Sequence, residues 1–201
     1  MKTFSVLGKG MHYRDSLVYN FFDYMKRGVN YQRRYKIASE YLRDVSSVLD
    51  VCAGTGRLKR FLPRNCRYTA LDASREFIAQ IKREGIAHIC WDLHRGMPDI
   101  AFKVDAAVMI ISLYHFRKTS VNNLLENLKG MGSRVIIVEE ISPQQREGHS
   151  LADRVMSYFC SADFFVPAAL FTPDEFRDVM QRHQYNFIRY DERYCVGYYR
   201  H

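Results

Sequence analysis

The chain has 201 residues, of which 47% are hydrophobic and 26% charged. A chain of this length and apolar content is expected to fold as a single domain of roughly 100–200 residues, which excludes a disordered or fibrous protein. Lys and Arg outnumber Asp and Glu by 30 to 22, for a formal net charge of +8, and this excess favours a negatively charged partner without choosing among a small anion, a nucleic acid and an anionic membrane face.

The pattern of apolar residues and cysteines excludes several classes. The longest strongly apolar run, residues 106–113, is well short of the roughly 20 residues of a membrane span, and residues 1–7 are too brief for a secretory signal. The five cysteines are widely spaced with no CxxC pair, so neither a disulfide framework nor a metal site is predicted. We therefore expect a cytoplasmic monomer or homodimer.

The first part of the chain is predicted to be helical. Leu17, Phe21 and Tyr24 follow one another at three- and four-residue steps, which is typical of an amphipathic helix. We expect residues 1–45 to form a helical flank or lid that makes a single globular unit with a main domain at residues 46–201.

From residue 47 onward, short β-branched or apolar runs alternate with segments of helical spacing. The predicted strands are 47–52, 68–72, 87–91, 104–111, 135–139, 185–190 and 194–199. The predicted helices are 57–62, 74–84, 120–130 and a segment capped by Thr172 with Pro173 in its first turn. Strands alternating with helices favour an α/β fold with a doubly wound, mostly parallel sheet covered on both faces.

Residues 48–58, with the sequence VLDVCAGTGRL, are an apolar strand that runs into a glycine-bearing turn and then a helix. Gly54 and Gly56 lack a Cβ, so the turn can be tight and a ligand can lie against the main chain, near the free N–H groups and dipole of the helix. This context predicts a site for an adenosine-bearing ligand. The alternative is that the two glycines only permit a tight turn.

The residues around the glycines exclude two common nucleotide motifs. Lys59 stands where a dinucleotide fingerprint needs its third glycine, and the spacing of a Walker A loop is absent. Asp50 lies instead near the end of the strand, where its carboxylate can attract a cationic amino-acid group.

Two further acids follow at the ends of the next two strands. Asp72 is 22 positions after Asp50, a spacing at which a carboxylate can accept hydrogen bonds from both hydroxyls of a ribose, and Asp92 is another 20 positions on. Each acid alone is as often a solvated or capping residue. Together they point to one ligand stretched across the carboxyl edge of the sheet.

Asp50 followed by Gly54-Thr55-Gly56 resembles motif I of the class I S-adenosylmethionine-dependent methyltransferases, with Cys52 where many members have another glycine. The resemblance implies their Rossmann-like fold, S-adenosylmethionine as the cofactor and methyltransferase activity. It also implies that Asp92 accepts from the adenine amine and that Leu93 flanks the adenine. The cofactor-binding residues expected on this basis are Asp50, Ala53, Gly54, Thr55, Gly56, Asp72, Ala73, Ser74, Asp92, Leu93 and Ile110.

Residues 104–116 resemble the fourth-strand segment of small-molecule methyltransferases, which commonly ends in a Leu-His-His-Phe-like sequence. Tyr114 replaces the first histidine. The resemblance places Tyr114 and His115 where an acceptor meets the methyl group, so that either residue can orient or deprotonate it; a purely structural histidine is the alternative. No Asn-Pro-Pro-Tyr-like sequence or Pro-Cys pair occurs, which argues against methylation of base amines and of cytosine C5.

The flanks resemble the methyltransferases of ubiquinone and menaquinone biosynthesis, through Tyr19-Asn20-Phe21-Phe22-Asp23 and the order of the segments after residue 139. This resemblance implies C- or O-methylation of a small aromatic or amphipathic acceptor. The expected acceptor-binding aromatics are Tyr19, Phe22, Tyr24, Tyr114, Tyr158 and Phe165, with Arg154 or Arg33 for an anionic group. An RNA methyltransferase that uses the basic surface and a non-catalytic S-adenosylmethionine-binding module stay open as alternatives.

Overall fold

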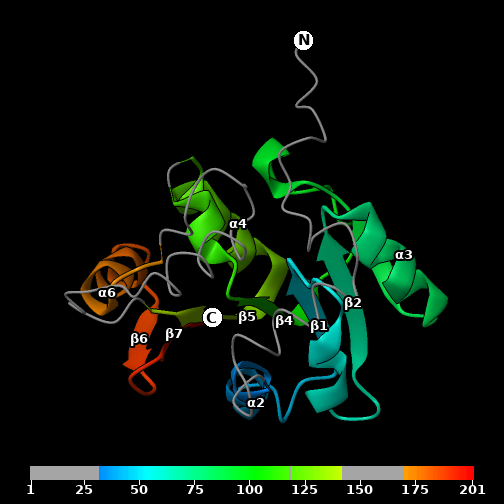
Figure 1. Cartoon of the computed structure of the whole chain (residues 1–201), viewed down its shortest axis with the longest axis horizontal. Helices are drawn as coiled ribbons and strands as arrows, with labels where there is room; N and C mark the ends of the chain where they lie inside the picture. The colour runs from blue at the N-terminus through cyan, green and yellow to red at the C-terminus, as the bar shows by residue number, and fades with distance from the viewer. Residues whose placement is uncertain (1–31, 118, 142–169) are drawn as a thin grey trace, which may run out of the picture. The chain divides into compact units, whose positions relative to one another are not determined.

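A computed structural model of the protein describes residues 32–117, 119–141 and 170–201. These residues form a seven-stranded sheet with helices on both faces (Figure 1). The predicted helix around Leu17 and Tyr24 lies outside the described residues. No helix of the described part has the length and apolar content that a membrane span requires.

The strand order is β3-β2-β1-β4-β5-β7-β6. β1 to β5 pair in parallel, and β7 runs antiparallel to both β5 and β6. The predicted doubly wound, mostly parallel sheet is therefore confirmed. The strands are β1 (Ser47–Val51), β2 (Arg67–Asp72), β3 (Ala87–Cys90), β4 (Val104–Ile110), β5 (Gly132–Glu140), β6 (Asn186–Arg189) and β7 (Tyr194–Arg200).

The strand order reverses between β1 and β4, and this switch point organises the fold. Ligands of open α/β sheets bind outside the carboxyl ends of the strands at such a point. The central strands are buried on both faces: all five residues of β1 are buried, as are residues 135–140 of β5. This double burial explains why these strands are continuous apolar runs and do not alternate with polar residues.

The helices divide between the two faces of the sheet. Side chains of α2 (Arg33–Glu40) and α3 (Arg75–Arg83) pack into the hydrophobic core of one face, and those of α4 (Val121–Met131) and α6 (Pro173–Arg182) into the core of the other. Figure 1 shows α2 and α4 on opposite sides of the sheet. α2 contacts β4 and β5 directly, so this part of the predicted flank packs on the sheet itself.

The segment after the glycine turn differs from its prediction. Residues 57–62 were expected to be a helix, and the structure has a short 3-10 helix, η4 (Arg57–Phe61). The helix is confined between Gly56, which has a left-handed backbone, and Pro63, which requires an extended residue before it; Leu62 has ψ 158°. A five-residue 3-10 helix aligns few peptide dipoles, so the predicted contribution of a helix dipole to this site is small.

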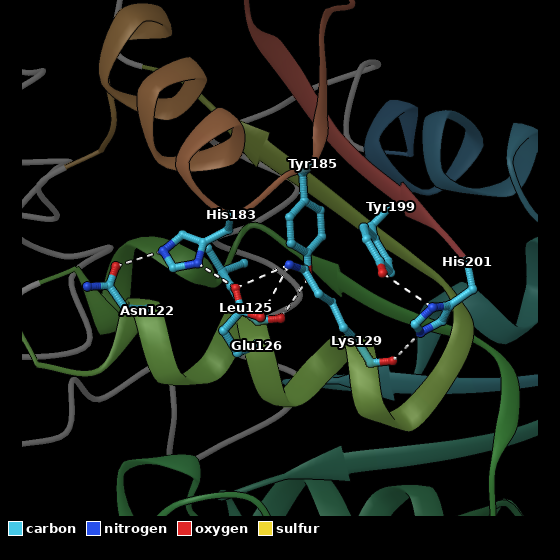
Figure 2. A network of polar contacts seen from close by, with 8 residues as sticks. All are labelled: Asn122, Leu125, Glu126, Lys129, His183, Tyr185, Tyr199 and His201. Carbon is cyan, nitrogen blue, oxygen red and sulfur yellow. Dashed lines mark hydrogen bonds and ion pairs between the residues drawn. The ribbon is translucent and has the colours of Figure 1, made fainter.

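A polar network ties the end of α6 and the start of β6 to α4 (Figure 2). The buried His183 contacts Glu126 Oε1 through Nδ1 at 2.8 Å and Asn122 Oδ1 through Nε2 at 2.9 Å. The Tyr185 hydroxyl donates to the Leu125 carbonyl at 2.8 Å. These bonds hold the last helix and the closing hairpin against the same helix that covers β4 and β5.

Between these two anchors, the chain leaves α6 through a left-handed residue, Gln184, whose φ is 60°. The Tyr185 N–H donates to the Met180 carbonyl at 2.9 Å, which is the hydrogen bond of a Schellman motif. Glycine normally occupies this position because a Cβ is strained there. The exposed Gln184 is held in place by the His183 and Tyr185 contacts on either side.

Gln184→Gly is expected to raise the free energy of unfolding by about 0.5–1 kcal/mol, because glycine adopts a left-handed backbone without strain. Gln181→Gly, at an exposed position inside α6, is the matched control; it is expected to lower the free energy of unfolding by about 0.5–1 kcal/mol. Urea denaturation of both variants measures the two changes. A lower midpoint for Gln184→Gly than for the wild type would contradict a left-handed residue at this position.

Candidate functional site

The loop after β1 turns sharply three times. Cys52, Gly54 and Gly56 all have a left-handed backbone, with φ of 59°, 56° and 70°. The Ala53 N–H donates to the Leu71 carbonyl at 3.0 Å, and the Gly56 N–H donates to the Ala53 carbonyl at 2.9 Å. The loop is thus closed on itself and hydrogen-bonded to β2, so its backbone has a fixed conformation at the switch point.

The two glycines have different surroundings. A Cβ added to Gly54 meets no atom of the described residues within 4 Å, whereas one added to Gly56 lies 3.4 Å from Ile81 Cγ1 and 3.6 Å from the Tyr68 hydroxyl. Gly56 therefore faces the protein and permits close packing of α3 and β2. Gly54 faces open space, where a ligand can approach the main chain. The neighbouring Thr55 is buried.

Asp72 joins the loop to the start of α3. Its Oδ2 accepts a hydrogen bond from the Gly54 N–H and its Oδ1 accepts one from the Ser74 N–H, both at 2.8 Å. Ser74 is buried and caps α3, since its Oγ accepts from the Phe77 N–H at 3.3 Å. Ala73, between them, is exposed. Because a carboxylate oxygen can accept more than one hydrogen bond, this holding role is compatible with a bound ribose.

Asp50 lies deeper than the sequence suggested. Its side chain is 3% exposed, and its Oδ2 accepts a hydrogen bond from the Tyr68 hydroxyl at 2.5 Å. Burial raises the pKa of Asp50 to about 7, the hydrogen bond from Tyr68 opposes this rise, and the charge of Asp72 adds to it. Tyr68 was not among the residues predicted for the site; the parallel register places it beside Val48 on the neighbouring strand.

Asp92 occupies the third position along the same edge. It follows β3, is exposed, and caps the 3-10 helix η5 (Leu93–Arg95) by accepting from the His94 N–H at 3.0 Å. Leu93 is 6% exposed and packs into the core. Its side chain is therefore part of the hydrophobic core at the end of β3, whereas Asp92 faces solvent.

Four carboxyl groups gather around Cys52. Burial raises the pKa of the Cys52 thiol well above its ordinary value, and the negative charges of Asp72, Asp50, Glu139 and Asp92 raise it further, in that order. The structure thus brings together the three acids singled out in the sequence. The fourth, Glu139, was seen only as the last residue of a strand.

Glu139 is completely buried near the carboxyl end of β5. Its Oε2 accepts a hydrogen bond from the Tyr114 N–H at 3.0 Å. Burial raises the pKa of Glu139 to about 8, against the lowering effect of the backbone N–H groups of Tyr114, Ser112 and Leu113. Its position at the end of an otherwise apolar run, IIVEE, is the sequence signal for this residue.

Tyr114 and His115 lie together in the 3-10 helix η6 (Leu113–Phe116), shortly after β4. Both are half-buried, and their ring centroids are 4.0 Å apart. Ile110, the last residue of β4, is also half-buried. Ile111 has a left-handed backbone with φ of 50°; together with Cys52 it places a strained residue at each side of the switch point.

The remaining predicted acceptor residues are not tested. Tyr19, Phe22, Tyr24, Arg154, Tyr158 and Phe165 lie outside the described residues. Arg33 lies on α2, and its Nε donates to Asp191 Oδ2 at 2.8 Å. This ion pair partly neutralises the charge that Arg33 was expected to offer to an anionic acceptor.

Comparison with protein families gives one match. Residues 48–131, which contain the 52–56 loop, Asp72, Asp92 and η6, match the model of the family described as "Methyltransferase domain". Residues 48–131 are therefore similar to a methyltransferase domain, and the strand order of the sheet is that of the class I methyltransferase fold. No curated protein matches this sequence.

Solved structures of methyltransferases share the fold of this chain at low sequence identity. Human N-acetylserotonin methyltransferase in complex with SAM superimposes with a TM-score of 0.63 at 16% identity, covering 92% of this chain and 56% of that chain. A DhpI–SAM–HEP complex superimposes with a TM-score of 0.62 at 20% identity, covering 91% of this chain and 95% of that chain. Magnesium protoporphyrin IX methyltransferase of Synechocystis PCC 6803 with bound SAH superimposes with a TM-score of 0.58 at 13% identity, covering 85% of this chain and 82% of that chain. This chain thus spans just over half of the N-acetylserotonin methyltransferase chain.

The residues of the candidate site fit S-adenosylmethionine. The space beside Gly54 admits a ligand to the main chain, and Asp72 and Asp92 present carboxylates along one edge. The carboxyls around Cys52 favour a positively charged group over an uncharged one. S-adenosylmethionine bound here would supply an activated methyl group on a sulfonium, which would leave these residues to hold donor and acceptor in line and to exclude water.

The burial of Asp50 makes the stability of the fold depend on pH. The pKa of Asp50 is about 7 in the folded chain and about 3.9 in an unfolded chain. Between these values the folded state holds a proton that the unfolded state has lost. Stability from this group is therefore present below about pH 4 and is lost as the pH rises towards 7, by up to about 1.4 kcal/mol per pH unit.

Asp50→Asn is expected to remove this contribution and to flatten the decline of the unfolding free energy between pH 5 and 7. Urea denaturation at pH 5, 6 and 7 measures the slope. Glu192→Gln is the control, and it is expected to keep the slope of the wild type because an exposed carboxyl is not desolvated by folding. Equal slopes for Asp50→Asn and the wild type would show that Asp50 is ionised in the folded protein.

Proposed function

We propose that this protein transfers the methyl group of S-adenosylmethionine to a carbon or oxygen atom of a small aromatic or amphipathic acceptor, similar to a quinone precursor. The observation that carries the proposal is the loop at residues 52–56. Its backbone is held by Asp72, it is open beside Gly54, and it lies at the switch point of a methyltransferase domain.

Two observations support a small acceptor. Solved structures that share the fold include a mitomycin 7-O-methyltransferase and an N-acetylserotonin methyltransferase, whose names refer to small molecules. Tyr114 and His115 place two tilted rings, with centroids 4.0 Å apart, shortly after β4. Aromatic rings in this position favour a flat acceptor, and the order of the flanking segments resembles that of the ubiquinone and menaquinone methyltransferases.

The proposal assigns roles to the predicted residues. The cofactor is held by the 52–56 loop, Asp50, Asp72, Asp92 and the neighbours named above. Tyr114 and His115 orient the acceptor, and His115 accepts the proton of its hydroxyl or acidic carbon. Residues 1–45 form a flank or lid, and Tyr19, Tyr24, Tyr158 and Phe165 contribute to acceptor binding.

The loop is tested with Gly54→Arg. An arginine at this position fills the open space beside the main chain with a long, positively charged side chain, so the affinity for S-adenosylmethionine in calorimetry is expected to fall by at least about tenfold, or 1.4 kcal/mol. Gly85→Arg is a matched control because Gly85 also has a positive φ, 67°, and open space around its Cβ. Gly85 lies in the turn before β3, at the opposite edge of the sheet, and its substitution is expected to leave the affinity unchanged.

Unchanged affinity in Gly54→Arg would overturn the assignment of the loop. The acceptor class is tested by incubating the wild type with methyl-labelled cofactor and a library of phenols, quinols and other aromatic acids. Label on a small molecule supports the proposal. Label found only on RNA, with binding that weakens steeply as salt is added, would favour an RNA methyltransferase, and no label on any acceptor would favour a binding module.

His115→Ala is expected to lower kcat for such an acceptor by about 100-fold or more, the typical contribution of a general base. It is expected to leave the Kd of S-adenosylmethionine unchanged and to abolish the acidic limb of the pH–rate profile. His94→Ala is the control. His94 is an exposed histidine of η5, and its ring stacks on Phe116 of η6, the helix that contains His115. Wild-type kcat in His115→Ala would assign His115 a structural role.

A further inference from the structure

Glu139 is a buried acid with an incomplete set of partners. Its Oε1 has no hydrogen-bond partner among the described residues, although the side chain is completely buried. The next residue on the strand, Glu140, does have a positive partner, since Arg193 Nε donates to Glu140 Oε1 at 2.8 Å. A buried carboxylate without a positive partner costs several kcal/mol, so the charge of Glu139 is poorly compensated in the chain by itself.

Glu139 interacts with an acidic neighbour and with backbone N–H groups, and its register partner on β7 is Cys195. Backbone N–H groups of η6 approach it on one side, with Tyr114 as the hydrogen-bond donor. On its own strand, Glu140 adds a negative charge. The charge of Glu139 also raises the pKa of the Cys52 thiol, as do the charges of Asp50, Asp72 and Asp92. A positive charge placed next to the 52–56 loop would therefore be stabilised by these acidic groups.

We propose that Glu139 is a specificity-determining residue for the charge of the cofactor. Its carboxylate stabilises the positively charged sulfonium of S-adenosylmethionine over the uncharged thioether of S-adenosylhomocysteine. It reaches this ionised form by releasing its proton to the solvent as the cationic cofactor binds. The inference rests on the proposed function, because it requires the cofactor to bind at the 52–56 loop.

The proton balance follows from burial and charge. Without a cation, burial holds the pKa of Glu139 at about 8, so near pH 7.5 the group is mainly a neutral acid. A positive charge nearby favours the carboxylate and lowers its pKa. The O–H bond then breaks and the proton passes to the buffer, with no other atom or electron transferred. Linkage therefore requires S-adenosylmethionine to bind more tightly as the pH rises towards 8, up to about tenfold per pH unit.

A comparison of S-adenosylmethionine with S-adenosylhomocysteine measures the effect of the sulfonium charge on binding. Both carry the same amino-acid group and nucleoside, and they differ by the methyl group with its positive charge. Calorimetry of the wild type at pH 7.5, in phosphate and in Tris, measures the protons released from the difference in buffer ionisation heat. We expect roughly 0.5–0.8 proton released on binding S-adenosylmethionine and near zero on binding S-adenosylhomocysteine.

Glu139→Gln is the matching variant, because the amide oxygen can still accept from the Tyr114 N–H. It is expected to bind S-adenosylmethionine without this proton release and to lose about tenfold of its preference over S-adenosylhomocysteine. Glu140→Gln is the control on the same strand and is expected to keep the proton release. A residue with only a structural role would change both affinities equally and leave the proton count unaltered.

Equal proton release for both ligands in the wild type would overturn the inference, and this measurement needs no variant to fold. Wild-type proton release in Glu139→Gln would also overturn it. Either result leaves the proposed function intact, because both ligands still bind. Failure of the wild type to bind S-adenosylmethionine at all would instead overturn the proposed function and the inference with it.

Discussion

The candidate site depends on one carboxylate that holds two pieces of backbone. Asp72 accepts one hydrogen bond from Gly54 and one from Ser74, and so connects the loop after β1 to the first turn of α3. Both donors are backbone N–H groups, whose positions are fixed by the strands and helix from which they come. A loop with three left-handed residues has little stability of its own, and its conformation is maintained because the neighbouring strand supplies this acceptor.

A second constraint is the concentration of negative charge at the switch point. Asp50 and Glu139 are both buried, come from strands on either side of β4, and are held by hydrogen bonds from Tyr68 and Tyr114. Neither hydrogen bond supplies a full positive charge. The protein lowers the cost of this arrangement by keeping protons on the two groups, and a cationic ligand lowers it further. The protonation of these two acids is therefore coupled to the binding of a cation.

The sequence predicted the sheet well because its main signals are local. Apolar runs such as 104–111 match β4 closely, and Thr172 and Pro173 mark the start of α6 as expected. The predictions were less successful where an outcome depends on distant residues. The helix expected at 57–62 is a 3-10 helix because Gly56 and Pro63 confine it, and the deep burial of Asp50 arises from Tyr68 on another strand. The role of Glu139 could not be predicted from the sequence, because it depends on the contact between β5 and η6.

The acids around Cys52 have a chemical consequence for the loop. Only the thiolate form of cysteine is a strong nucleophile, and the pKa of Cys52 is raised well above its ordinary value by burial and by four surrounding carboxyl groups. Its sulfur therefore stays protonated at neutral pH and reacts poorly with electrophiles. The low reactivity of this thiol is therefore compatible with the alkylating cofactor that the proposed function places beside the loop.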